Sequence, residues 1–182
     1  MEVMNKGKVI LQKFCEEFKK ENYDVLFIEA GTEDELDVLQ VFVNLDDEWQ
    51  QQRVEIRAIP QIPFSKGQDP ESHPLYIRIE FLLHFNIDIQ NESVPQIESS
   101  VCIFNTLVDL PGFEYNAIDD VIQFRTVQFM REDAIDPKFA LGLIGAIVLY
   151  HRLYGPSFEK IAKGELTLDE ILQNSISLLT ET

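Results

Sequence analysis

Apolar residues recur along this chain with two different periods, which predicts an α+β protein. Near the start, Ile10, Phe14 and Phe18 follow one another every four residues, and charged side chains lie off this stripe. This spacing is typical of an amphipathic helix. We expect that helix from about Asn5 to Glu21.

The period then changes to two. Strand-like runs occupy 24–29, 36–45 and 53–59, and the short polar segments 30–32 and 46–48 connect them. Because tight polar turns join neighbouring antiparallel strands, these runs are expected to pair as a meander. In the third run, apolar and charged positions alternate, with Val54, Ile56 and Ala58 on one side and Glu55 and Arg57 on the other.

Two contrasting segments follow the meander. Residues 60–74 contain four prolines and one glycine, which predicts a long Pro-rich loop. Residues 75–87 alternate strictly between two sets of side chains, and this is the strongest strand signal in the chain.

The second half predicts helices around a hairpin. Ser93 and Gln96 match a capping box with Pro95 in the first turn, and 111–115 with 121–131 read as a hairpin. Asp136 and Pro137 start a long helix, expected to end near Tyr154 because Gly155 and Pro156 follow. A short helix at 157–163 and a second capping box at 167–170, which opens a helix to about Leu179, complete the chain. We therefore expect a single α+β domain, 1–182, with helices packed on one face of a twisted antiparallel sheet.

Charge restricts the partners. The formal net charge is −17, and no Lys or Arg lies between Lys20 and Arg53 or between Ile79 and Phe124. Such a surface repels phosphate backbones and anionic lipid, so we expect neither a nucleic acid nor a membrane as partner. High acidity serves solubility or forms a docking face for a basic protein, and the sequence leaves both open.

The sequence favours a cytoplasmic protein. Residues 1–7 contain no apolar core of a signal peptide, and the longest apolar stretch, 139–150, is too short to cross a bilayer. Cys15 and Cys102 lie in apolar patterns, so we expect reduced, buried thiols.

None of the motifs GxGxxG, Walker loop, HExxH, CxxC and GxSxG occurs in the sequence, and we expect neither an enzyme nor a cofactor. His73, His84 and His151 have no second ligand at metal spacing, so no metal site is expected either. A nucleophilic pair of Cys102 and His84 is conceivable, but a buried thiol on a helix is the commoner case.

Several residues are candidates for protein contacts. Trp49, Phe64, Tyr76 and Leu82 lie near the long loop or on the strand that follows it, and would form a binding patch if exposed or core if buried. Gly142 and Gly145 lie inside an apolar helix, where they permit close packing on the sheet or on a second subunit. That helix is the candidate dimer element of a homodimer.

The layout from Val94 to Leu172 resembles a known bacterial family. Phe104-Asn105 on a helix leads to the loop 110–113 (LPGF), then to the hairpin strand 121–125 (VIQFR), the connector 134–136 (AID) and the tail 161–166 (IAKGEL). This layout is similar to the YbjN family of bacterial sensory-transduction regulators, whose fold is similar to that of type III secretion chaperones. The resemblance implies α+β architecture, dimerisation and action through protein contacts, and it transfers no catalytic residues. The loop 60–74, the long strand after it and the C-terminal helices depart from the minimal family pattern.

Three function classes remain open. We expect a non-enzymatic protein-binding module, a regulator or a chaperone, that uses an exposed sheet face, edge or groove. The alternative is a small-molecule sensor or enzyme with a pocket between sheet and helices, in which Arg125, His84 and Glu80 would converge. The third is a structural or phage-related assembly subunit, which would form a larger oligomer.

Overall fold

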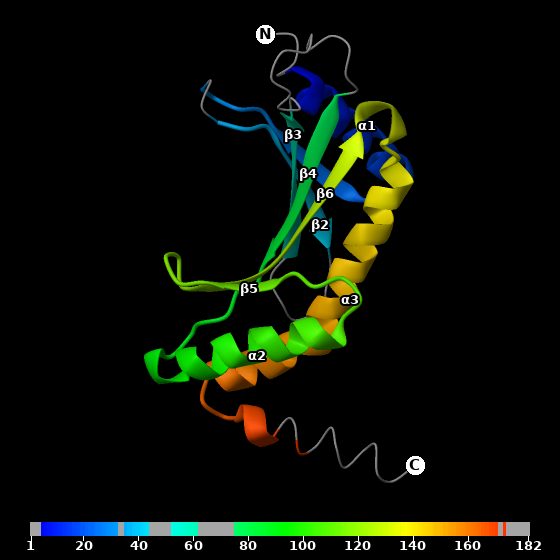
Figure 1. Ribbon diagram of the computed structural model, residues 1–182. Coiled ribbons are helices and arrows are strands. Elements are labelled where there is room, and N and C mark those ends of the chain that lie inside the picture. The colour runs from blue at the N-terminus through cyan, green and yellow to red at the C-terminus, as the bar shows by residue number, and fades with distance from the viewer. Residues whose placement is uncertain (1–4, 33–34, 44–51, 62–74, 171–172, 174–182) are drawn as a thin grey trace, which may run out of the picture. The chain divides into compact units, whose positions relative to one another are not determined.

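The chain folds as an α+β protein with one six-stranded antiparallel sheet, as the sequence predicted (Figure 1). The computed structural model describes residues 5–32, 35–43, 52–61, 75–170 and 173. The strands follow one another across the sheet in the order β1-β2-β3-β4-β6-β5.

The helices and strands fall close to the predicted ranges. In chain order they are α1 Asn5–Lys20, β1 Asp24–Ile28, β2 Val38–Val43, β3 Gln52–Gln61, β4 Tyr76–His84, the 3-10 helix η2 Asn91–Ser93, α2 Val94–Leu107, β5 Phe113–Asn116, β6 Val121–Arg131, the 3-10 helix η3 Glu132–Ala134 and α3 Pro137–Ala162. The meander β1–β4 and the hairpin β5–β6 are confirmed. β3 runs through Pro60 to Gln61, and the rest of the predicted loop lies outside the described residues.

The chain divides into two compact units. Unit 1 contains 1–83 and 125–148, and unit 2 contains 84–124 and 149–182. β6 and α3 each run from one unit into the other. The prediction of a single domain concerns independent folding, which this division does not test.

Unit 1 has its core between α1 and one face of the strands. Alternate strand residues point to that face and are buried with the helix stripe; they are Leu39, Val41, Val43, Val54, Ile56, Ala58, Ile77, Ile79, Phe81 and Leu83. α1 approaches β3 closely at Gly7, where an added Cβ would lie 2.1 Å from the backbone oxygen of Ala58. Only a residue without a side chain allows this approach.

Unit 2 has an aromatic core. The ring of Phe113 lies 5.1–6.4 Å from five others, those of Phe85, Phe104, Phe124, Tyr154 and Phe158. Asn105 fixes the chain beside this core: its Oδ1 accepts hydrogen bonds from the backbone N–H groups of Gly112 and Phe113, and its Nδ2 donates to Phe113 O at 2.9 Å.

The predicted end of the long helix at Gly155-Pro156 is wrong, because α3 continues through both residues to Ala162. A proline inside a helix removes one backbone hydrogen bond. Phe158, Ile161 and Ala162 beyond it are fully buried. Burial of this last segment outweighs the helix-breaking tendency of the Gly-Pro pair.

The two predicted capping boxes behave differently. At α2, Ser93 makes no side-chain cap hydrogen bond, and Gln96 Oε1 instead accepts a hydrogen bond from Leu168 N at 2.9 Å. At 167–170 the box is present: Thr167 N donates to Glu170 Oε2, and Glu170 N donates to Thr167 Oγ1. The hydrogen bonds that Thr167 N and Thr167 Oγ1 donate to the Glu170 carboxylate, the backbone bond first, hold the pKa of Glu170 below its ordinary value.

Candidate protein-binding surface

The sheet of unit 1 has a second face, opposite α1, which we call the open face. The strand alternation that buries one set of side chains against α1 turns the other set to this side. The open face includes Leu26 and Ile28 of β1, Val38 and Gln40 of β2, Arg53, Glu55, Arg57 and Ile59 of β3, Tyr76, Arg78, Glu80 and Leu82 of β4, and Arg125, Val127, Phe129 and Arg131 of β6.

A ladder of charged side chains crosses the middle of the open face. Glu80 lies directly opposite Arg57 in the β3/β4 pair, and its side chain is only 8% exposed. Arg125 Nε lies 2.5 Å from Glu80 Oε1, and Arg57 lies 3.8 Å from Glu80 Oε2. Both carboxylate oxygens of Glu80 therefore face an arginine, which compensates its burial.

Glu55 is the second carboxylate of the ladder. Arg57 lies 3.1 Å and Arg53 lies 3.4 Å from its two oxygens. Gln40, directly across the β2/β3 pair, donates a hydrogen bond to Glu55 Oε1 at 3.1 Å. The ladder thus joins four strands through side chains as well as backbone.

The register of β6 against β4 determines which residues lie opposite one another on the open face, near the start of β4. Glu132 N donates to Leu75 O at 3.0 Å, directly before β4 and after β6. In an antiparallel pair, each step forward along β4 from Leu75 is matched by one step backward along β6 from Glu132. This gives every β4 residue one opposite residue on β6. The pairs on the open face are Tyr76 with Arg131, Arg78 with Phe129 and Glu80 with Val127.

Large apolar side chains are exposed on both sides of the ladder. Leu26 and Ile28 on the edge strand β1 are exposed, and so are Tyr76 and Phe129 at the other end. Phe129 is 63% exposed. A sheet face that served only to contact water would carry polar residues at these positions.

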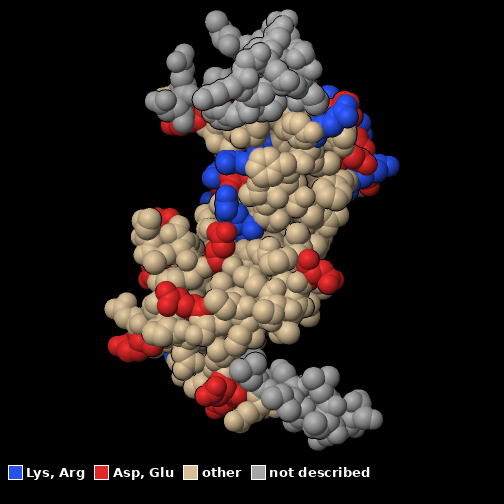
Figure 2. Space-filling model, in the orientation of Figure 1, with Lys and Arg blue, Asp and Glu red and all other residues tan. Residues whose placement is uncertain are grey.

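Basic side chains gather on the open face although the whole chain is acidic. The chain has six arginines, and five of them, Arg53, Arg57, Arg78, Arg125 and Arg131, lie on β3, β4 and β6 of this face. The same strands place two glutamates there, Glu55 and Glu80. Figure 2 shows a group of Lys and Arg side chains over these strands with acidic groups between them.

The structure places the predicted contact residues as follows. Trp49 and Phe64 lie outside the described residues. Tyr76 is exposed on the open face, whereas Leu82, on the same face of β4, is buried. Of this candidate set, Tyr76 is therefore available for contact.

Gly142 and Gly145 lie on the exposed side of α3, and an added Cβ at either would meet no atom within 4 Å. Phe139, Leu149 and Leu153 on α3 are also exposed. Phe139 lies three residues before Gly142, Leu149 lies four residues after Gly145, and Leu153 lies four residues after Leu149. We call these five residues of α3 the α3 stripe. By length and composition alone, α3 could also cross a membrane, with 22% of its most apolar window buried.

The residues of the alternative pocket are only partly together. Glu80 and Arg125 form the ion pair described above. His84 lies four residues beyond Glu80 on β4, which is about 13 Å along an extended strand. His84 is exposed.

The expectation of two buried thiols is half wrong. Cys15 is buried, but Cys102 is exposed, since the α2 side that packs inward carries Ile97, Ser100 and Phe104 instead. Over the described ranges, no three His, Cys, Asp or Glu residues lie close enough to hold a metal ion.

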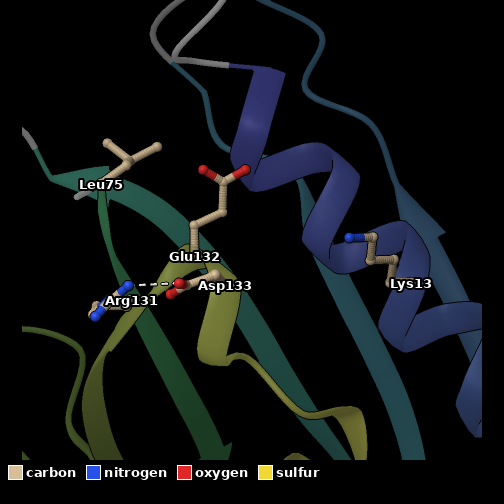
Figure 3. A pocket seen from close by; sticks show the side chains of 5 residues that line it. All are labelled: Lys13, Leu75, Arg131, Glu132 and Asp133. Atoms are coloured by element: carbon tan, nitrogen blue, oxygen red, sulfur yellow. Dashed lines mark hydrogen bonds and ion pairs between the residues drawn. The ribbon is translucent and has the colours of Figure 1, made fainter. Parts of the chain in front are cut away.

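A cavity of about 380 Å³ lies at the end of β4 and β6, lined by Lys13, Leu75, Arg131, Glu132 and Asp133 (Figure 3). Three of the four charged lining residues are paired: Arg131 lies 2.6 Å from Asp133, and Glu132 accepts two hydrogen bonds from Lys6. Figure 3 shows Arg131 and Asp133 turned toward each other. Lys13 is the fourth charged lining residue, and one cation by itself does not make the set of convergent polar groups typical of a ligand site.

No protein family model, curated protein or solved structure matches the chain. The resemblance to the YbjN family stays a prediction.

Arg78, Arg131 and Phe129 were missed as site residues. The signal was in the sequence, because the arginines occupy alternate positions in three predicted strands. That these arginines share one face follows only when the pairing of strands far apart in the chain is known.

Proposed function

We propose that the protein is a non-enzymatic protein-binding module and that the open face is its binding surface. The observation that carries the proposal is the combination of exposed Tyr76 and Phe129 with arginines on one face of a sheet whose other face is buried. Aromatic residues and arginine are the types enriched at protein interfaces. Leu26 and Ile28 on β1 extend the apolar area to the sheet edge.

The ladder supports this role by keeping the face in one conformation. Arg57, Arg125, Glu55 and Glu80 hold one another across the strands. A surface that is already ordered loses little conformational entropy on binding. The face is therefore ordered in advance for recognition of a partner segment.

The test compares two equally exposed apolar residues. Phe129→Ser changes the open face, and Leu107→Ser, on α2, changes a residue that is also 63% exposed. Tagged protein captures partners from native lysate, and a photo-crosslinking amino acid at 129 or 107 identifies the protein in contact. We expect a stoichiometric partner that crosslinks at 129, that Leu107→Ser retains and that Phe129→Ser loses. A partner retained equally by both variants, or no partner at all, would contradict the proposal.

We also propose that two copies associate through the α3 stripe. No Asp or Glu lies between Pro137 and Phe158, so this helix is a surface on which two chains of charge −17 can approach without carboxylate repulsion. Gly142 and Gly145 permit close backbone approach.

Light scattering over a concentration series measures the association. We expect a dimer for the wild type and for Leu107→Lys, and a monomer for Leu149→Lys with Leu153→Lys. A monomeric wild type would disprove the dimer, and co-flotation of the wild type with lipid vesicles would assign the stripe to a membrane instead.

A further inference from the structure

Arg78 differs from the other arginines of the open face. Its Nε is buried and has no hydrogen-bond partner among the described residues. The neighbouring carboxylate, Glu80, already has both oxygens directed at Arg57 and Arg125. The cross-strand neighbours of Arg78 are apolar: Ile59 on β3 and Phe129 on β6.

A guanidinium N–H that is buried without an acceptor is unfavourable, because it has lost its hydrogen bonds to water and gained none in the protein. Arg78 is a half-buried side chain on a long, flexible stem, so a change of side-chain rotamer can expose this N–H to a ligand. A carboxylate would then accept the parallel pair of hydrogen bonds that a guanidinium offers.

Arg131 supplies a second positive charge nearby. It lies diagonally across the β4/β6 pair from Arg78, at a spacing of about 7 Å. Its partner Asp133 is 66% exposed, and Arg131 itself is 53% exposed, so this surface pair can be exchanged for another at little cost. Alternate residues of an extended peptide are also about 7 Å apart and point to the same side.

We propose, resting on the protein-binding function above, that the partner contributes an extended acidic segment to this end of the open face. Carboxylates at positions i and i+2 of the segment contact Arg78 and Arg131. An adjacent apolar residue packs on Tyr76 and Phe129. A singly charged carboxylate fits better than a phosphate, because the other arginines of the face are already paired with Glu55 and Glu80 and little further positive charge remains.

The probe is a displayed library of random 12-residue peptides selected on immobilised full-length protein. We expect enriched peptides with Asp or Glu at i and i+2 next to an aromatic or aliphatic residue. In fluorescence anisotropy, the best peptide should lose at least tenfold in affinity with Arg78→Gln. Arg78→Lys should cost nearly as much, because lysine keeps the charge but not the paired donors. The matched control is Arg152→Gln, an exposed arginine on α3 outside the open face, with less than a twofold change.

The outcomes separate the two proposals. Peptides without acidic residues whose binding Phe129→Ser abolishes would overturn the acidic-segment proposal and leave the binding surface intact. Acidic peptides that bind Arg78→Gln and Phe129→Ser as well as wild type would overturn both. Failure of the library to enrich any binder would also count against both. Circular dichroism of each variant excludes unfolding as the cause.

Discussion

Arg125 Nε lies 2.5 Å from Glu80 Oε1, and this contact joins β6 to β4 on the open face of the sheet. Glu80 is nearly buried, whereas about a third of the Arg125 side chain is exposed. The nearly buried Glu80 carboxylate therefore needs the arginines to compensate its charge, whereas Arg125 is also partly solvated by water.

Replacing Arg125 with methionine should destabilise the protein by about 2 kcal/mol, below the usual loss for a fully buried pair because Arg57 remains beside Glu80 and Arg125 is partly exposed. The double variant Arg125→Met with Glu80→Leu should recover part of this loss, because no buried charge is then left alone. Urea unfolding measures both. Arg53→Met is the control, expected within about 0.5 kcal/mol of wild type. Equal losses in the single and double variants would show that the pair has no electrostatic role.

Glycine has opposite roles at two sites. Gly7→Ala should destabilise the protein by about 1–3 kcal/mol, because the added methyl group would overlap the backbone oxygen of Ala58. Gly142→Ala meets no neighbour and should stabilise α3 by about 0.5–1 kcal/mol. Thermal unfolding in dilute solution compares the two, so that any self-association through α3 does not contribute. A stable Gly7→Ala would mean that α1 does not approach β3 as closely as described.

Asn105 should prove structural. Asn105→Ala removes three hydrogen bonds to residues 112 and 113 and should cost about 2 kcal/mol. Asn105→Asp keeps the acceptor but loses the donor to Phe113 O, so an intermediate loss is expected at neutral pH. Denaturant unfolding ranks the three proteins. If Asn105→Asp were as stable as the wild type, the hydrogen bond from Asn105 Nδ2 to Phe113 O would contribute nothing to stability.

The two thiols should react at very different rates. Cys102 is exposed and Cys15 is buried, so iodoacetamide should modify one thiol per native chain rapidly and both after unfolding. Mass spectrometry of digested protein identifies the residue, and Cys102→Ser should remove the fast reaction. Rapid modification of Cys15 in the folded protein would contradict the packing of α1.

Local patterns along the chain determined most of the secondary structure. The recurrence of Ile10, Phe14 and Phe18 every four residues predicted α1. The strict alternation of two sets of side chains after residue 75 predicted β4 and its buried face. These patterns succeed because each element is buried on one side, and burial on one side imposes a period on the sequence. The Thr167–Glu170 capping box was equally readable, since all of its contacts lie within four residues.

Tertiary structure decided whatever depends on residues far apart in the chain. α3 continues through Gly155 and Pro156 because Phe158 beyond them is buried in a core formed by other segments, and Cys102 is exposed because other residues of α2 face inward. The open face also depends on residues that are far apart in the chain. Arg125 and Glu80 are 45 residues apart in the sequence, and only strand pairing places them side by side. The same pairing leaves Arg78 Nε without an acceptor among the described residues.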